Sequence, residues 1–332
     1  MKHTVETARR VIGTGLVLLA VAMVLGAGLA GCRKSPTIAP YDAYLTGDDK
    51  APPKTEFVCE LTKTMDPRVG VLRGIATDAE DRVYAVGSGG LAVLDAMGLE
   101  LNRWKVPEDA QAVAVGEDGT VYVGVTAGIV KFDPEGKRLG SWGSEGAGPG
   151  ELRRVTSVVV KGADVFVADA RNLCIQRFDK EGVFGGAIGK RDHKTEFLGL
   201  IAPSPFLDFV VDKDGQVIVG NPGRLRVETY AADGKLAGFW GEPGLAPERF
   251  CGCCNPTNLA ITRDGLLVTS EKGIPRVKVY DRTGKMLAYI PPRMFSPAAE
   301  GMDLAVDSRD RIYVAEPVKG RILVFEMKKT AP

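Results

Sequence analysis

Three of the chain's six cysteines lie within four positions, in the segment RFCGCCNPTN: Cys251, Cys253 and Cys254. Thiols at this spacing can form one local disulfide, between Cys251 and Cys254 or between the neighbours Cys253 and Cys254, as in proteins of oxidising compartments. They can instead bind a soft metal ion, Cu(I) or Zn(II), as three thiolates, with His193 as a fourth ligand. They can also stay reduced, as inert or redox-active thiols. The residue types leave these three alternatives open.

A second group of residues offers oxygen ligands. Asp208, Asn258 and Asp303 each stand directly before a short apolar run, in DFVV, NLAI and DLAV. This common register predicts that they occupy equivalent places in three repeats and that they converge. Converging carboxylate and amide oxygens suit Ca²⁺. The alternative is a polar lining that keeps a channel filled with water.

The elements that would position these residues are repeats. A turn of the form aromatic or Leu, then Asp-x-x-Gly, recurs with small variations and ends at Gly98, Gly136, Gly182, Gly234 and Gly284. Six residues after each glycine stands a large apolar residue: Trp104, Trp142, Ile188, Trp240 and Ile290. All three tryptophans of the chain occupy this one place. We therefore predict that they pack between repeats rather than bind a ligand.

A second turn, which contains Asp or Gly, precedes these between two short runs rich in Val, Ile and Tyr. It occurs six times, in AEDRVYAV, GEDGTVYV, GADVFVA, DKDGQVIV, RDGLLVT and SRDRIYVA, and each occurrence has the pattern of a β-hairpin. Each repeat thus predicts four antiparallel strands, named a to d along the chain. No segment of the sequence has a sustained helical period. Four-stranded units at this spacing are typical of a β-propeller.

The two ends of the repeat region predict how the ring closes. The last repeat, from residue 301 on, holds only three strands, whereas a spare strand, TEFVCELTKT at residues 55–64, precedes the first repeat. An open ring would leave bare sheet edges. We therefore predict that the N-terminal strand becomes the outer strand of the last blade. The expected fold is an all-β, six-bladed propeller over residues 55–332.

The other cysteines of this region cannot join the group of three. Cys59 falls on the closing strand of blade 6 and Cys174 on strand c of blade 3. These blades lie opposite each other in a six-membered ring, too far apart for a disulfide. We predict that both residues are buried thiols.

Residues 146–189, GAGPGELRRVTSVVVKGADVFVADARNLCIQRFDKEGVFGGAIG, resemble an NHL repeat. The other blades follow that pattern more loosely. The resemblance implies a propeller that serves as a binding platform, and a minority of such propellers are enzymes. The NHL pattern has an acid five residues before an arginine, and we predict that such pairs tie strand b to strand c. The matching positions are Asp169, Asn221, Glu271 and Glu316, followed by Cys174, Arg226, Arg276 and Arg321.

A resemblance to another family gives an alternative function. Ca²⁺-dependent lactonases of the gluconolactonase type are also six-bladed propellers with acidic and Asn ligands. The present chain is similar to them in the residue types Asp208, Asn258 and Asp303, but GMDLAVD is offset by one from that family's Asp-Gly-Met pattern. The resemblance implies a metal-dependent lactonase- or lyase-like enzyme with Ca²⁺ or Zn²⁺ in the channel. A further alternative is a copper- or zinc-handling protein that uses the CGCC loop.

The N-terminal residues predict targeting. A basic segment is followed by the apolar run VIGTGLVLLAVAMVLGAGLA and by LAGC at residues 29–32. This ending resembles the lipobox of bacterial lipoproteins, which implies cleavage before Cys32 and a lipid on its sulfur; an uncleaved membrane helix is the alternative. Arg33 differs from the aspartate that retains many lipoproteins in the inner membrane. We expect a signal peptide at 1–31 and a tether at 32–54. The expected location is the cell envelope, facing the periplasm or the exterior, at the outer membrane rather than the inner one.

Composition and missing motifs favour a binding protein. The formal net charge of +1 gives no electrostatic footprint for nucleic acid. The sequence contains no P-loop, dinucleotide fingerprint, nucleophile elbow or metalloprotease motif. The leading hypothesis is a lipid-anchored, monomeric binding or scaffold module outside the cytoplasm. Its long, variable loops between strand d of one blade and strand a of the next would bind an extracytoplasmic protein or a small ligand.

Overall fold

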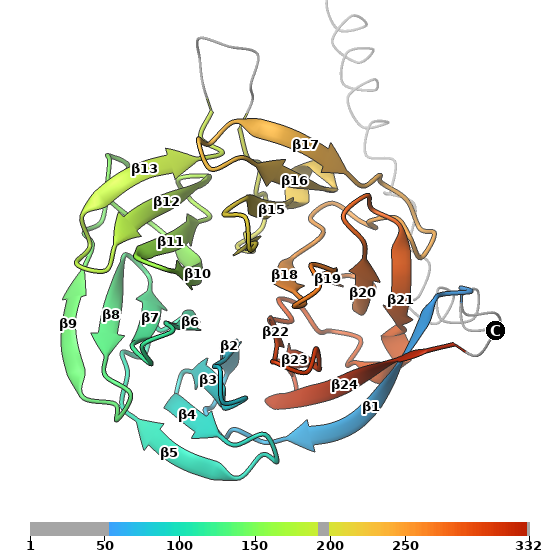
Figure 1. Cartoon of the computed structure of the whole chain (residues 1–332), viewed down its shortest axis with the longest axis horizontal. Helices are drawn as coiled ribbons and strands as arrows, with labels where there is room; N and C mark the ends of the chain where they lie inside the picture. The colour runs from blue at the N-terminus through green and yellow to red at the C-terminus, as the bar shows by residue number, and fades with distance from the viewer. Residues whose placement is uncertain (1–52, 192–198, 331–332) are drawn as a thin grey trace, which may run out of the picture. The chain divides into compact units, whose positions relative to one another are not determined.

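The computed structural model describes residues 53–191 and 199–330 as six four-stranded antiparallel sheets around a central channel (Figure 1). Short runs of β-branched residues alternate with tight Asp- and Gly-containing turns, so each run pairs with the next one along the chain. Strand a of each sheet faces the channel and strand d lies at the rim. The predicted all-β, six-bladed propeller is confirmed. The whole predicted signal peptide and residues 32–52 of the predicted tether, which include Cys32, lie outside the described residues. His193 also lies outside them.

The blades follow one another in chain order. Blade 1 contains β2 (Leu72–Thr77), β3 (Val83–Gly87), β4 (Gly90–Leu94) and β5 (Glu100–Trp104), and blade 2 contains β6 (Ala112–Val115), β7 (Val121–Val125), β8 (Gly128–Phe132) and β9 (Arg138–Trp142). Blade 3 contains β10 (Val155–Lys161), β11 (Asp164–Asp169), β12 (Cys174–Asp179) and β13 (Phe184–Ile188). Blade 4 contains β14 (Phe209–Val211), β15 (Val217–Asn221), β16 (Arg226–Tyr230) and β17 (Leu236–Trp240). Blade 5 contains β18 (Asn258–Ile261), β19 (Leu267–Glu271), β20 (Arg276–Tyr280) and β21 (Met286–Ile290).

Blade 6 is built from both ends of the described chain. It contains β22 (Leu304–Val306), β23 (Ile312–Glu316), β24 (Arg321–Lys329) and the N-terminal strand β1 (Phe57–Met65). β1 runs antiparallel to β24, with Phe57 opposite Lys329 and Met65 opposite Ile322. The predicted closure of the ring by the N-terminal strand is therefore confirmed.

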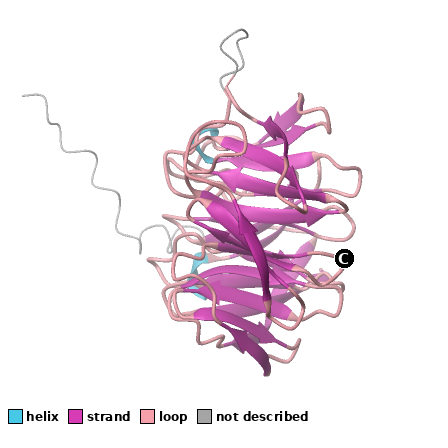
Figure 2. Cartoon of the chain, turned by 90° about the vertical axis from the view of Figure 1, so that its left-hand side faces the viewer, coloured by secondary structure: helices cyan, strands magenta, loops and turns pink. Residues whose placement is uncertain are grey.

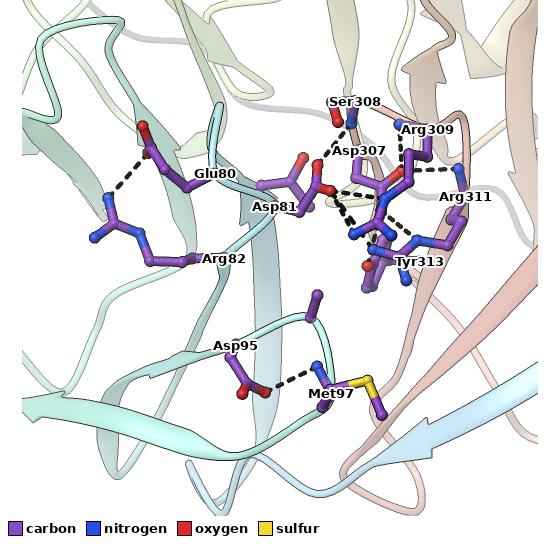
Figure 3. Close-up of polar contacts among 12 residues, drawn as sticks. Glu80, Asp81, Arg82, Asp95, Met97, Asp307, Ser308, Arg309, Arg311 and Tyr313 are labelled. Carbon is purple, nitrogen blue, oxygen red and sulfur yellow. Dashed lines mark hydrogen bonds and ion pairs between the residues drawn. The ribbon is translucent and has the colours of Figure 1, made fainter.

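The a–b turns also hold the seam between blades 6 and 1 (Figure 3). The carboxylate of Asp81, in blade 1, accepts hydrogen bonds from the backbone N of Ser308 at 2.9 Å and from Nε and Nη2 of Arg309 at 3.0 and 2.8 Å. Burial raises the pKa of Asp81, but the bonds from Ser308 and Arg309 outweigh it and lower that pKa below its ordinary value. The neighbouring blade 6 turn is braced by Asp307, whose Oδ2 accepts from Nε of Arg311 at 2.5 Å.

The tryptophans pack between blades, as predicted. Each lies at the end of a strand d and meets an aromatic ring of the following blade. Gly182 shows why glycine recurs beside them: its φ of +88° is left-handed, and an added Cβ would lie 2.4 Å from Cγ of Trp142. The ring-centroid distances are 6.0 Å for Trp104 and Phe132, 4.5 Å for Trp142 and Phe178, and 4.7 Å for Trp240 and Tyr280.

The propeller has two unlike faces. The a–b and c–d turns form one face, called here the turn face. The d–a connections and the b–c loops form the other, called here the d–a face. The latter carries the two short 3₁₀ helices, η1 (Pro222–Arg224) and η2 (Pro292–Met294), on the left in Figure 2. Within the described part of the chain, no helix has the length and apolar character needed to cross a membrane.

Candidate functional site

The inner strands bring together the three residues predicted to line the channel. Asp208 directly precedes β14, Asn258 begins β18, and Asp303 directly precedes β22. Nδ2 of Asn258 donates a hydrogen bond to Oδ1 of Asp303 at 3.2 Å. Both aspartates line a channel cavity of about 230 Å³. Asn258 lines a second cavity, of about 200 Å³, at the end of the channel that opens on the d–a face.

The two aspartates also join neighbouring blades. Oδ2 of Asp208, in blade 4, accepts a hydrogen bond at 2.8 Å from the backbone N of Leu259 in blade 5. Oδ2 of Asp303, in blade 6, accepts one at 2.7 Å from the backbone N of Ile75 in blade 1. Inner strands at a channel have no neighbour on one edge, so their free N–H groups need such partners. These carboxyl groups therefore hold the ring together as well as line the channel.

The protonation of this group is unusual. Burial raises the pKa of Asp208 to about 6. Burial and then the charge of Asp208 raise the pKa of Asp303 to about 8. Asn258 is 9% exposed, and its Oδ1 has no hydrogen-bond partner among the described residues. Below about pH 6 both carboxyl groups therefore stay neutral, unlike ordinary aspartates.

The same oxygens could hold a hard cation. Ca²⁺ takes about six to eight oxygen ligands, so the three side chains would need water to complete the shell. No group of three His, Cys, Asp or Glu residues in the described part of the chain is arranged to hold a metal. The Ca²⁺ site stays a prediction.

We expect the free energy of unfolding to fall as the pH rises from about 4 to 8. The ordinary pKa of both groups is 3.8, whereas the folded protein keeps these protons up to about pH 6 and 8. The folded state thus binds more protons than the unfolded state in this window, and deprotonation destabilises it. The pKa of Asp208 alone is raised by about two units, and one unit corresponds to about 1.4 kcal/mol, so the loss should be at least about 3 kcal/mol. Denaturant unfolding across this pH range measures the effect.

The matched variant for this prediction is Asp303→Asn. An amide resembles the neutral carboxyl group in shape and can still accept from Ile75, so most of the pH dependence should disappear. If Ca²⁺ binds these carboxylates, it should stabilise the unaltered protein at high pH and so reduce the dependence of its unfolding free energy on pH. It should have little effect on the variant. An unchanged pH slope in Asp303→Asn would contradict the assignment.

The cysteine loop lies on the d–a face, in the connection from β17 to β18. Cys251 and Cys254 are buried, Cys253 is exposed, and all three are free thiols. The Sγ atoms of Cys253 and Cys254 are 3.3 Å apart. The sulfur of Cys251 instead lies 3.8 Å from Nδ2 of Asn255, and burial raises its pKa to about 11. The structure thus brings two of the three thiols together.

The remaining two thiols lie where the sequence predicted. Cys59 is on β1 and Cys174 is on β12. Cys174 is buried, as predicted, whereas the prediction is only partly right for Cys59, which is partly buried because β1 is an outer strand. Burial raises the pKa of each thiol to about 12.

A buried ion cluster on β19 and β20 contacts the backbone at the start of the cysteine loop. Glu271, Arg276 and Lys278 have no exposed side-chain surface, and Glu271 pairs with both cations. Arg276 and Lys278 also each donate a hydrogen bond at 2.8 Å to the backbone O of Arg249, at the start of the loop. Burial lowers the pKa of Lys278 to about 8. The sequence predicted the pair of Glu271 with Arg276 but not the contact with Lys278. Lys278 could have been recognised because it lies two residues after Arg276, on the same face of an otherwise apolar strand.

The recurring position at the end of strand b anchors the d–a connections. In four blades its side-chain oxygen accepts a hydrogen bond from the backbone of the preceding connection. The pairs are Asp169 with Arg153 N at 2.8 Å, Asn221 with Ile201 N at 3.1 Å, Glu271 with Cys251 N at 3.0 Å and Glu316 with Ser296 N at 2.7 Å.

The predicted tie between strands b and c is confirmed in two blades and wrong in one. Glu271 pairs with Arg276, and Glu316 pairs with Arg321. In blade 4, Arg226 pairs instead with Glu228 on its own strand, because the residue at the strand b position, Asn221, carries no charge.

The d–a face combines apolar and cationic surface around the channel mouth. Val71 and Val318 are 56% and 55% exposed. Arg154 is exposed and has no ion pair with any residue in the described ranges. Arg73 donates from Nη1 to the backbone O of Glu108 at 2.7 Å and of Ala110 at 2.9 Å. Val71, Arg73 and Arg154 line the cavity at the mouth.

Comparison with known proteins supports a broad classification only. No protein-family profile matches the chain. The chain is 27% identical over 151 residues to "Protein brain tumor" of Drosophila melanogaster, a match that covers 44% of this chain and 13% of that protein. The chain therefore corresponds to a small part of this relative. The similarity is a weak link to an NHL-repeat protein.

Proposed function

We propose that this chain is a binding module that holds a protein partner on its d–a face, outside the cytoplasm, while a lipid on Cys32 anchors it to a membrane. The observation that carries the binding role is the d–a face itself. Four of its connections are long, those that precede blades 3 to 6, and buried side chains fix these four to the sheets. Loops held on a rigid scaffold can present a defined surface without a large loss of entropy on binding.

The chemistry of the d–a face suits a protein rather than a nucleic acid. Exposed Val71 and Val318 offer apolar contact area, and the exposed Arg154 offers a guanidinium without an ion-pair partner among residues 53–191 and 199–330. Arginine is enriched in protein interfaces, and the exposed valines add apolar area that binding can remove from water. The formal net charge of +1 lacks the cationic excess that nucleic acid requires.

A channel enzyme is the second candidate. It rests on Asp208, Asp303 and the unpartnered Oδ1 of Asn258, which would bind Ca²⁺ or Zn²⁺ for a lactonase- or lyase-like reaction. The hydrogen bonds between blades already account for the two carboxyl groups. We therefore favour the binding module.

Glutamate substitution on the d–a face should weaken partner binding at least about tenfold, which corresponds to roughly 1.4 kcal/mol. The variants are Val71→Glu and Val318→Glu, which place a charge on the apolar part of the face. Photo-crosslinking from position 71 in intact cells identifies the bound protein. Affinity of the purified pair then measures the loss.

The matched control is Val183→Glu, because Val183 is 63% exposed but belongs to a c–d turn on the opposite face. It should leave binding and thermal stability unchanged. Equal loss of binding in Val183→Glu and Val71→Glu would contradict a role for the d–a face.

The anchoring part of the proposal has its own test. Cys32→Ala should abolish incorporation of labelled palmitate and leave the N-terminal segment uncleaved, because the thiol is the acceptor of the lipid. Normal processing and membrane release of this variant would contradict the lipobox interpretation but leave the binding role standing.

A further inference from the structure

The loop that carries Cys253 and Cys254 is held at both of its ends. At one end, the backbone N of Cys251 donates to Oε2 of the buried Glu271 at 3.0 Å. At the other, Asn255 makes a reciprocal pair with Lys272, receiving its N–H at 2.9 Å and donating to its carbonyl O at 3.0 Å. Nδ2 of Asn255 also donates to the carbonyl O of Cys251 at 2.6 Å, which closes the loop on itself.

The closed loop holds two neighbouring sulfurs in contact. Gly252 takes a left-handed φ of +73°, and an added Cβ there would meet no atom closer than 3.9 Å. Glycine is thus needed for the backbone turn and not for space. The turn leaves Cys253 exposed and Cys254 buried, with their Sγ atoms 3.3 Å apart.

The arrangement of the three sulfurs argues against a three-thiolate metal site. The Sγ atoms of Cys253 and Cys254 are in contact, at 3.3 Å. Cys251, which a three-thiolate site would need, has its sulfur beside Asn255 instead. Cys253 and Cys254 therefore form a pair, and Cys251 lies apart from them.

We propose that Cys253 and Cys254 form a thiol–disulfide exchange site, whose substrate is a small disulfide and whose oxidised form is the disulfide between these neighbours. The proposal does not depend on the partner-binding role. It selects one of the alternatives that the three cysteines leave open.

The exchange has two steps. The exposed Cys253 thiolate attacks one sulfur of the disulfide RSSR; a mixed disulfide forms and RS⁻ leaves. The Cys254 thiolate then attacks Sγ of Cys253, the new disulfide closes and the second RS⁻ leaves. Two protons are released from the protein thiols and taken up by the two RS⁻ groups. The protein loses two electrons and RSSR gains them.

The difference in exposure of the two thiols suits this order. Small disulfides reach Cys253 because it is exposed, whereas Cys254 is shielded. Burial, followed by the hydrogen bond with Cys253, raises the pKa of Cys254, and the charge of Lys272 partly offsets this. A thiol with a raised pKa is a poor leaving group. An external thiol that attacks Cys253 should therefore reopen the disulfide slowly.

The test uses the full chain in detergent, equilibrated with mixtures of reduced and oxidised glutathione, quenched with acid and alkylated. Peptide mass spectrometry counts the free thiols. The unaltered protein and Cys251→Ser should each lose two hydrogen atoms from the loop peptide. Cys254→Ser should instead stop at the mixed disulfide on Cys253, which should accumulate at least about tenfold more than in the unaltered protein.

Other outcomes would overturn the proposal. Loss of the disulfide in Cys251→Ser, with thermal stability kept, would assign the pair to Cys251 and Cys254. Reduced cysteines in excess oxidised glutathione, in a folded protein, would show an inert site. A zinc complex that needs all three thiols would restore the three-thiolate prediction. Cys174→Ser serves as control, because that thiol is buried in another blade.

Discussion

Deletion of residues 55–65 should leave a chain that aggregates or loses most of its stability, which for a domain is about 5–15 kcal/mol. The deletion removes β1, the outer strand of blade 6, and bares the N–H and C=O groups of β24 along its whole length. It also removes Phe57 and Cys59, which pack against the core shared by blades 5 and 6. Size-exclusion chromatography and thermal unfolding measure both effects.

A matched truncation and a rescue sharpen this test. A chain that lacks residues 33–52 but keeps β1 should unfold at the same temperature as the unaltered chain. A synthetic peptide of residues 55–65, added to the deleted chain, should restore part of the lost stability by pairing with β24. A soluble, equally stable deletion variant would show that the ring closes without β1.

Glu271→Gln should destabilise the protein by about 3–5 kcal/mol, because it leaves two buried cations without their counter-charge. Arg276 and Lys278 have no exposed side-chain surface, so water cannot take the place of the carboxylate. Glutamine can still accept the hydrogen bond from the backbone of Cys251, so the loss reports on charge. Denaturant unfolding gives the change in free energy.

Glu316→Gln is the matched control for this substitution. Glu316 occupies the same place in blade 6, but the side chain of its partner Arg321 is 26% exposed, so the cost should be clearly smaller. Adding Lys278→Met to Glu271→Gln should recover at least about 1 kcal/mol, because it removes one of the stranded cations. Equal losses in Glu271→Gln and Glu316→Gln would contradict the assignment of the cost to the stranded buried cations.

The sequence predicted the fold well because each repeat carries its own local signals. The Asp-x-x-Gly turns and the tryptophans report on contacts between segments that lie close in the chain or one blade apart. The closing strand was predictable for another reason: the last repeat lacked one strand, and a spare one stood before the first. Sheet edges must be covered, so the two ends were assigned to each other.

The candidate sites were predictable only in their residue types. The register of Asp208 and Asp303 indicated a shared channel, but their role in joining blades depends on backbone N–H groups 51 and 228 residues away. Which two of the three loop cysteines meet depends on the backbone turn at Gly252 and on the hydrogen bonds of Asn255. The spacing of the cysteines cannot identify the pair, because any two of the three are close enough in the sequence to meet.

Because β1 pairs with β24 in the same blade, the order of the blades around the ring does not depend on which blade comes first in the chain. The backbone N of Thr330 donates to the carbonyl O of Glu56 at 3.0 Å, so the two ends of the described chain lie side by side. A short linker could join them, and the circle could then be cut in another d–a connection to give a circularly permuted chain. Any blade could then come first in the gene, and the seam would move with the cut while the arrangement of the six sheets stayed the same.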